Sequence, residues 1–138
     1  MIDLFPESAQ VEGGELTLGG VKTSALAEEF GTPLVVYCEQ TVRAQARAYR
    51  AAAPGALLAY GTKAFANVAL LQVLAEEGLG ADVSTLGELA FARAAGIPDE
   101  HLVLHGGVQD RLQERVGLPG RRRSRGGGDV CVPFADER

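Results

Sequence analysis

Residues 56–83, ALLAYGTKAFANVALLQVLAEEGLGADV, decide the fold of this chain. The segment opens with an apolar run at residues 56–60, which predicts a short buried strand. Residues 67–77 then repeat apolar side chains at spacings of three and four, which predicts a helix, and Gly78 stands where that helix would end. Residues 79–83 predict a second strand. A strand, a helix and a strand joined by short connections are typical of a parallel βαβ unit.

The same alternation extends towards the N-terminus. Residues 33–37, PLVVY, form an apolar, β-branched run that predicts another buried strand. Residues 41–53 predict a helix with Val42, Ala46 and Tyr49 on one face. The sequence before residue 56 therefore adds a further βα unit.

Towards the C-terminus, residues 85–96 predict a third helix, and residues 101–105, HLVLH, predict a fourth strand. Such units fit either a doubly wound parallel sheet or a TIM barrel, and periodicity alone does not separate the two. A complete TIM barrel needs about 250 residues, so the barrel interpretation implies that this chain holds only part of one.

The composition excludes several classes of protein. The chain has 138 residues, of which 46% are hydrophobic and 22% charged, as in soluble globular proteins. No run approaches the roughly 18 apolar residues of a membrane span, and the first residues do not resemble a signal peptide, so we expect a cytoplasmic protein with no membrane partner. Cys38 and Cys131 lie far apart, and no Cys, His and Asp set has metal-ligand spacing. The sequence therefore predicts neither a disulfide framework nor a metal site.

Charge divides the chain in two. Residues 1–105 hold 13 acidic and 6 basic side chains, which argues against nucleic-acid binding, whereas residues 106–138 hold 5 and 7. In the second part the alternation of predicted strands and helices stops. Its Arg- and Gly-rich segment resembles an RGG-type nucleic-acid-binding tail, but it occurs once and lacks interleaved aromatic residues, which argues against that function. We expect an ordered region at 1–105 and an irregular tail at 106–138 that is either disordered or the product of a frameshift.

Lys63 is the first candidate for chemistry because it directly follows the strand predicted at residues 56–60. In a parallel barrel this position lies at the carboxyl ends of the strands, where functional sites gather. An uncharged lysine there can form a Schiff base with an aldehyde cofactor. From position alone, a solvated lysine at a strand end is the commoner explanation.

Ordered motifs over residues 13–105 resemble the ornithine, diaminopimelate and arginine decarboxylases, whose barrel is similar to that of alanine racemase. Residues 31–37 (GTPLVVY) resemble the GTPLYVY segment of the diaminopimelate decarboxylases, the most similar members. Residues 59–64 (AYGTKA) resemble the group's cofactor-lysine motif, Tyr-Ala-x-Lys-Ala, with Gly61 in place of the usual alanine.

Two further segments, residues 76–83 (EEGLGADV) and 87–89 (GEL), resemble the next block of the group. The resemblance ends at His105-Gly106, where the group usually continues as His-Gly-Asn-Asn-Lys. The glycine-rich phosphate loop and the acid that faces the pyridine nitrogen have no counterpart in this sequence.

The resemblance implies an α/β fold that holds the first three to four βα units of a TIM (β/α)8 barrel, with pyridoxal 5'-phosphate as the cofactor. It implies that Lys63 holds the cofactor as a Schiff base and that Asp82 and Glu88 are carboxylates with catalytic roles. Asp82 and His105 would also contact the cofactor. The expected reaction is decarboxylation of a small amino acid, meso-diaminopimelate, to L-lysine in lysine biosynthesis, by an enzyme that is a homodimer at full length.

Other functions stay open at this point. The chain could belong to another decarboxylase or to a racemase with the same barrel and the same lysine. It could instead be a non-catalytic pyridoxal phosphate-binding module or a relic protein. Because much of the group's cofactor site is missing from the sequence, we expect little or no activity from the 138-residue chain.

Overall fold

The computed structural model describes residues 5–104. The chain divides into two compact units, and the boundary in the sequence lies between Ala51 and Ala52. Within the described range, no helix combines the length and the apolar character needed to cross a membrane.

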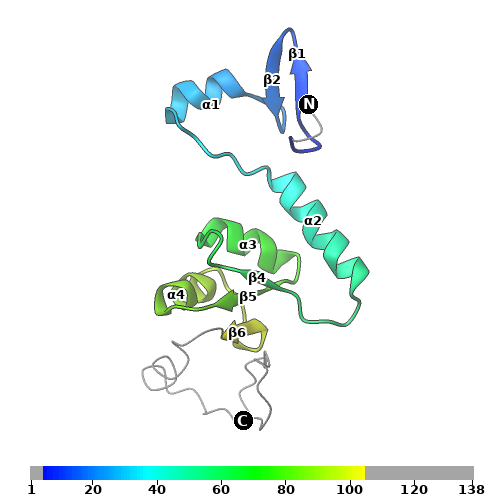
Figure 1. Ribbon diagram of the computed structural model, residues 1–138, viewed down its shortest axis with the longest axis vertical. Helices are drawn as coiled ribbons and strands as arrows, with labels where there is room; N and C mark the ends of the chain where they lie inside the picture. The colour runs from blue at the N-terminus through cyan, green and yellow to red at the C-terminus, as the bar shows by residue number, and fades with distance from the viewer. Residues whose placement is uncertain (1–4, 105–138) are drawn as a thin grey trace. The chain divides into compact units, whose positions relative to one another are not determined.

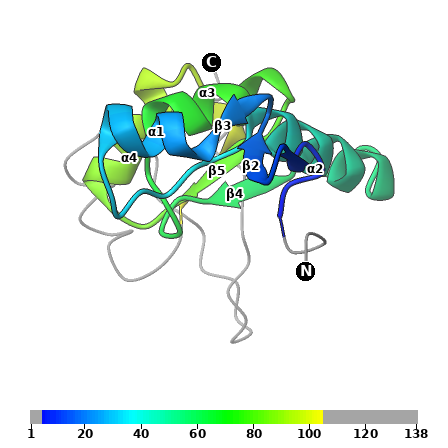
Figure 2. The same ribbon diagram turned by 90° about the horizontal axis from the view of Figure 1, so that it is seen from above.

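The first unit begins with a small antiparallel sheet that the sequence analysis did not anticipate. Its strands follow the order β1-β2-β3 and lead directly into a helix: β1 (Gln10–Glu12), β2 (Glu15–Leu18), β3 (Val21–Lys22) and α1 (Thr23–Phe30). Figure 2 labels β2, β3 and α1. Two Gly-Gly pairs make its tight turns, at residues 13–14 and 19–20, and all four glycines have positive φ. Positive φ at both central residues is what two-residue hairpin turns require, so these glycines set the strand register.

The buried strand predicted at residues 33–37 is wrong for the part of the chain that the structure describes. No described strand pairs with this segment, and Val35 is 80% exposed. An apolar run becomes a strand only when a neighbour supplies hydrogen bonds, and that neighbour is not specified by the run itself.

The helix predicted at residues 41–53 is confirmed as α2 (Glu39–Ala52). Its first turn is stabilised by an ion pair between Arg43 Nε and Glu39 Oε1, 2.8 Å apart. Ala46 is buried as predicted, but Tyr49 is 64% exposed. The prediction that Val42, Ala46 and Tyr49 form one buried face is therefore wrong for Tyr49.

The second unit is a parallel α/β structure. In Figure 1 its strands follow the order β4-β5-β6 and its helices connect them: β4 (Ala59–Gly61), α3 (Val68–Glu76), β5 (Gly80–Val83), α4 (Leu86–Ala94), the 3-10 turn η2 (Asp99–His101) and β6 (Leu102–Leu104). Ala59 pairs with Gly80 and Ala81 with Leu102, a separation of 21 residues in both cases. Because parallel crossovers are right-handed, this strand order places both helices on the same face of the sheet, as in a barrel wall.

Both helices of the second unit are capped in the same way. The side chains of Asn67 and Thr85 accept hydrogen bonds from backbone N–H groups in the first turns of α3 and α4. Each helix ends at a glycine with positive φ, Gly78 or Gly96, and the next residue donates its N–H five residues back. This is the Schellman arrangement, and it turns the chain sharply towards the following strand.

The core of the second unit lies between the two helices and the sheet. Its buried apolar side chains come from α3, β5, α4, the segment after α4 and β6, and they form one cluster: Leu71, Ala81, Val83, Leu89, Ala92, Ala95, Ile97 and Leu102. The strands predicted at 79–83 and 101–105 and the two helices predicted between 67 and 96 are confirmed to within two residues at each described end. The strand predicted at 56–60 is shifted, since its hydrogen bonds run from Leu58 to Thr62.

Gly80 offers a direct test of this packing. A Cβ at this position would lie 2.0 Å from the backbone oxygen of His101, so the strand and η2 could not keep their present approach. We expect Gly80→Ala to lower the free energy of unfolding by about 1–3 kcal/mol, measured by urea denaturation.

The matched control is Gly87→Ala in the first turn of α4. A Cβ there would meet only Thr85 Oγ1, at an ordinary 3.9 Å. Alanine is the better helix former, so this change should raise the free energy of unfolding by up to about 1 kcal/mol. Equal effects of the two substitutions would contradict the close approach at Gly80.

Candidate functional site

Lys63 lies on a tight turn at the carboxyl end of β4. The turn is closed by a hydrogen bond from the Ala64 N–H to the Gly61 carbonyl oxygen, 3.1 Å long. A second, longer contact of 3.5 Å joins the Tyr60 hydroxyl to the Phe65 carbonyl oxygen. The side chain of Lys63 is exposed, so its amine is accessible while its backbone is held from both sides.

Thr62, directly before Lys63, is only 1% exposed and anchors this turn to the neighbouring strand. Its N–H donates to the Asp82 carbonyl oxygen at 3.0 Å, which continues the β4–β5 ladder by one residue. Its Oγ1 lies 2.7 Å from the same carbonyl oxygen and 2.9 Å from Glu88 Oε2. Thr62 therefore connects the end of β4 with the end of β5 and with α4.

Glu88 is held at the first turn of α4. Its Oε2 accepts a 2.7 Å hydrogen bond from the Ser84 N–H, and its own N–H donates to Thr85 Oγ1 at 3.1 Å. This reciprocal pattern is a capping box in which the carboxylate reaches the N–H one residue before the N-cap. The Ser84 hydrogen bond is the main cause that lowers the pKa of Glu88 below its usual value, so the carboxylate is ionised at neutral pH.

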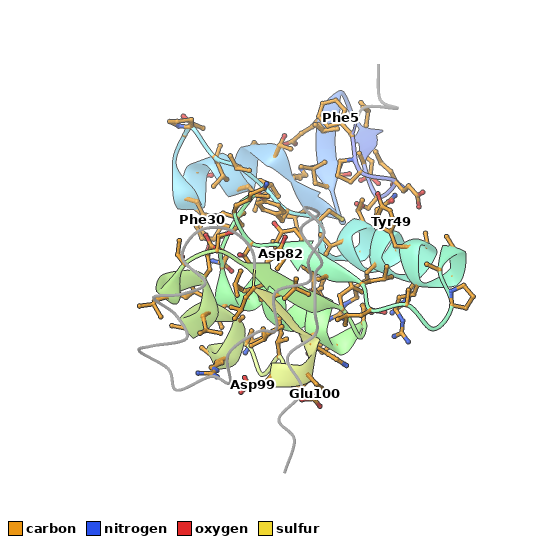
Figure 3. All side chains as sticks on the ribbon, turned by 60° about the horizontal axis from the view of Figure 1, so that its bottom comes forward. Phe5, Phe30, Tyr49, Asp82, Asp99 and Glu100 are labelled. Carbon is orange, nitrogen blue, oxygen red and sulfur yellow. The ribbon has the colours of Figure 1, made fainter. Side chains whose placement is uncertain are left out.

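Asp82 belongs to the same edge of the sheet. It is half-buried on β5 and is the register partner of Gly61, two residues before Lys63. Figure 3 shows Asp82 at one end of the sheet and Asp99 and Glu100 at the other, before β6. Asp82 and Glu88 therefore lie at the end of the sheet where Lys63 follows β4.

The structure thus places three of the four predicted site residues at one edge, and His105 lies outside the described residues. Hydrogen bonds connect Glu88 and the backbone of Asp82 to Thr62, the neighbour of Lys63. Sequence reasoning missed Thr62 itself. The sequence shows only a hydroxyl side chain between an apolar strand and the candidate lysine, and a polar residue is ordinary at that position.

These residues fit one end of the predicted cofactor. An exposed primary amine on a fixed turn is suited to an aldehyde, so Lys63 would hold that end. The first turn of α4 does not fit a phosphate, because the ionised carboxylate of Glu88 already occupies it. The phosphate would therefore be held by other groups than the start of α4.

Cys38 lies apart from this edge in the chain, in the first unit. Its Sγ is 3.0 Å from Ser8 Oγ, and this hydrogen bond is the main cause that lowers the pKa of the thiol. Among residues 5–104, no three His, Cys, Asp or Glu side chains gather as a metal site would require.

The part of the chain that holds this edge is similar to known proteins. Residues 39–117 match the sequence profile of the "Pyridoxal-dependent decarboxylase, pyridoxal binding domain" family. The match continues past residue 105, and the division predicted there stays a prediction.

Curated relatives carry the name diaminopimelate decarboxylase. The protein from Actinosynnema pretiosum is 47% identical over 136 residues, which cover 97% of this chain and 30% of the relative. The protein from Bacillus subtilis is 42% identical over 122 residues, which cover 86% of this chain and 28% of the relative. This chain therefore spans less than a third of the length of these relatives.

Solved structures show the same similarity. A protein from Aquifex aeolicus superimposes with a TM-score of 0.73 and 40% identity, over 80% of this chain and 28% of that one. Diaminopimelate decarboxylase from M. jannaschii, solved in complex with L-lysine, gives 0.71 and 28% identity over the same shares. The predicted α/β fold, an N-terminal part of a TIM barrel, is confirmed, and so is pyridoxal phosphate as the cofactor of the family. The chain belongs to the pyridoxal-dependent decarboxylase family, through its pyridoxal binding domain.

Proposed function

We propose that this protein takes part in the decarboxylation of meso-diaminopimelate to L-lysine and that Lys63 is the residue that holds pyridoxal phosphate. The observation that carries the proposal is the exposed Lys63 amine on a hydrogen-bonded turn at the carboxyl end of a parallel strand. Family membership and the names of the curated relatives support the reaction, and the M. jannaschii complex with L-lysine supports the product. By the same resemblance we propose a cytoplasmic enzyme that acts as a homodimer.

The described residues have separate tasks in this proposal. When bound, pyridoxal phosphate supplies a pyridine ring that accepts the electrons left by departing carbon dioxide. Lys63 Nζ would hold the aldehyde end of this cofactor. Asp82 and Glu88 would place two carboxylates at the edge of the sheet where Lys63 follows β4. The turn contacts around Thr62 keep the backbone of Lys63 at one position.

The role of Lys63 can be tested on the 138-residue chain. Incubation with pyridoxal phosphate and reduction with borohydride should label Lys63 in preference to Lys22, the only other lysine in the sequence. Lys22 is a fair control because it is also exposed and pairs only at 3.4 Å with Glu15. Peptide mass spectrometry reads both sites in one sample, and equal labelling would reject Lys63 as the cofactor lysine.

Turnover can be tested in a chimera that joins residues 1–104 of this chain to the remainder of the Bacillus subtilis relative. Carbon dioxide release from meso-diaminopimelate should persist with Lys63 intact. It should fall by about a thousandfold or more in Lys63→Ala, because the covalent anchor is lost. Lys22→Ala should leave the rate unchanged. An active Lys63→Ala chimera would contradict the proposal.

The charge of Glu88 makes a separate prediction about pH. Its folded-state pKa is lowered, so the ionised carboxylate stabilises the fold above the unfolded pKa near 4.5, and this contribution disappears as the pH falls through the lowered value. Thermal unfolding should therefore show a larger loss of stability between neutral and acid pH in the wild-type chain than in Glu88→Gln. An equal loss of stability with falling pH in the two proteins would show that the ionised Glu88 carboxylate does not stabilise the fold.

A further inference from the structure

The hydroxyl of Thr62 is not needed for the strand pairing beside it. The Thr62 N–H already donates to the Asp82 carbonyl oxygen at 3.0 Å. The hydroxyl has one proton and two acceptors within reach, the same carbonyl at 2.7 Å and Glu88 Oε2 at 2.9 Å. A carboxylate is the stronger acceptor, and the carbonyl oxygen already accepts the Thr62 N–H. We therefore assign the hydrogen bond of the hydroxyl to the Glu88 carboxylate, with the hydroxyl as donor.

Glu88 is a firm anchor for this hydrogen bond. Its carboxylate accepts the Ser84 N–H, and its own N–H is bound by Thr85. Leu89, the next residue, is 4% exposed and belongs to the core cluster. A hydrogen bond to Glu88 therefore attaches a group to the first turn of α4, and through it to the packed core.

The group attached in this way is the turn that presents Lys63. On its far side the turn is closed by the Ala64 N–H and the Gly61 carbonyl oxygen. On its near side Thr62 is buried at 1% exposure. Lys63 lies between Thr62 and Ala64, so any shift of Thr62 also moves the backbone from which the lysine side chain extends.

We infer that Thr62 is a positioning residue for Lys63, acting through the hydrogen bond from its hydroxyl to the Glu88 carboxylate. The inference rests on the proposed function, because it gives Thr62 a role in presenting the cofactor lysine. Thr62 does not touch the reacting atoms. It fixes the turn from which the Lys63 side chain extends, so less of the chain has to be ordered when the amine meets an aldehyde.

The test compares Thr62→Val, which keeps the shape and removes the hydroxyl, with Thr62→Ser, which keeps the hydroxyl. Each 138-residue variant is treated with pyridoxal phosphate and borohydride, and the labelling of Lys63 is divided by that of Lys22. We expect Thr62→Val to lower this ratio by about tenfold, the effect of losing one charge-assisted hydrogen bond, and Thr62→Ser to restore it.

A stability-matched control separates positioning from folding. Ile97→Val removes one methyl group from the core, away from the Lys63 turn, and should lower stability without changing the labelling ratio. An equal fall in the ratio for Ile97→Val and Thr62→Val would overturn the inference. So would a Thr62→Val chain that labels like the wild type while the wild type still prefers Lys63.

A second measurement needs no cofactor and remains informative if labelling fails. Amide hydrogen exchange in Thr62→Val should become faster at Ala64, which closes the turn, and remain unchanged at Ile97, which closes the end of α4. Unchanged exchange at Ala64 would show that the hydroxyl does not hold the turn. Equal labelling of Lys63 and Lys22 in the wild type would reject the proposed function, and with it any positioning role.

Discussion

The pairing of β4 with β5 is the constraint on which the rest of the candidate site depends. Their register sets Gly61 beside Asp82, and one further backbone hydrogen bond carries the pairing on to Thr62. Lys63 is then the first residue beyond the ladder. Because the strands are parallel, the turn after β4 and the start of α4 after β5 meet at the same edge. The lysine that follows β4 and the carboxylates of β5 and α4 are therefore brought to the same edge without a long loop.

The parallel part of the fold was predictable because its signals are local. Apolar spacing identified α3 and α4, and Gly78 and Gly96 marked where the chain turns back. The antiparallel sheet was missed, although the Gly-Gly pairs at 13–14 and 19–20 are strong hairpin signals. Those pairs were not interpreted as turns, and the strands that they connect are too short to show alternation.

Two other results depended on partners that a sequence does not name. The run at residues 33–37 has the composition of a strand, but its pairing partner is not specified locally, and the described residues leave it unpaired. Thr62 reads as an ordinary polar residue at a strand end. Its burial and its contact with Glu88, 26 positions away, follow from the register of two strands and the cap of a helix. Lys63 was identified through motifs, and its neighbour required the fold.

The repeated ending of α3 and α4 has a consequence for how the second unit is built. Each helix closes with the same glycine turn, and the strand that follows pairs only 21 residues back. Each of these strands therefore pairs with a strand that was synthesised shortly before it. Such low contact order allows the sheet to grow one strand at a time as the chain leaves the ribosome. Lys63, the candidate lysine, would then be in place as soon as α4 has formed, before most of a barrel exists.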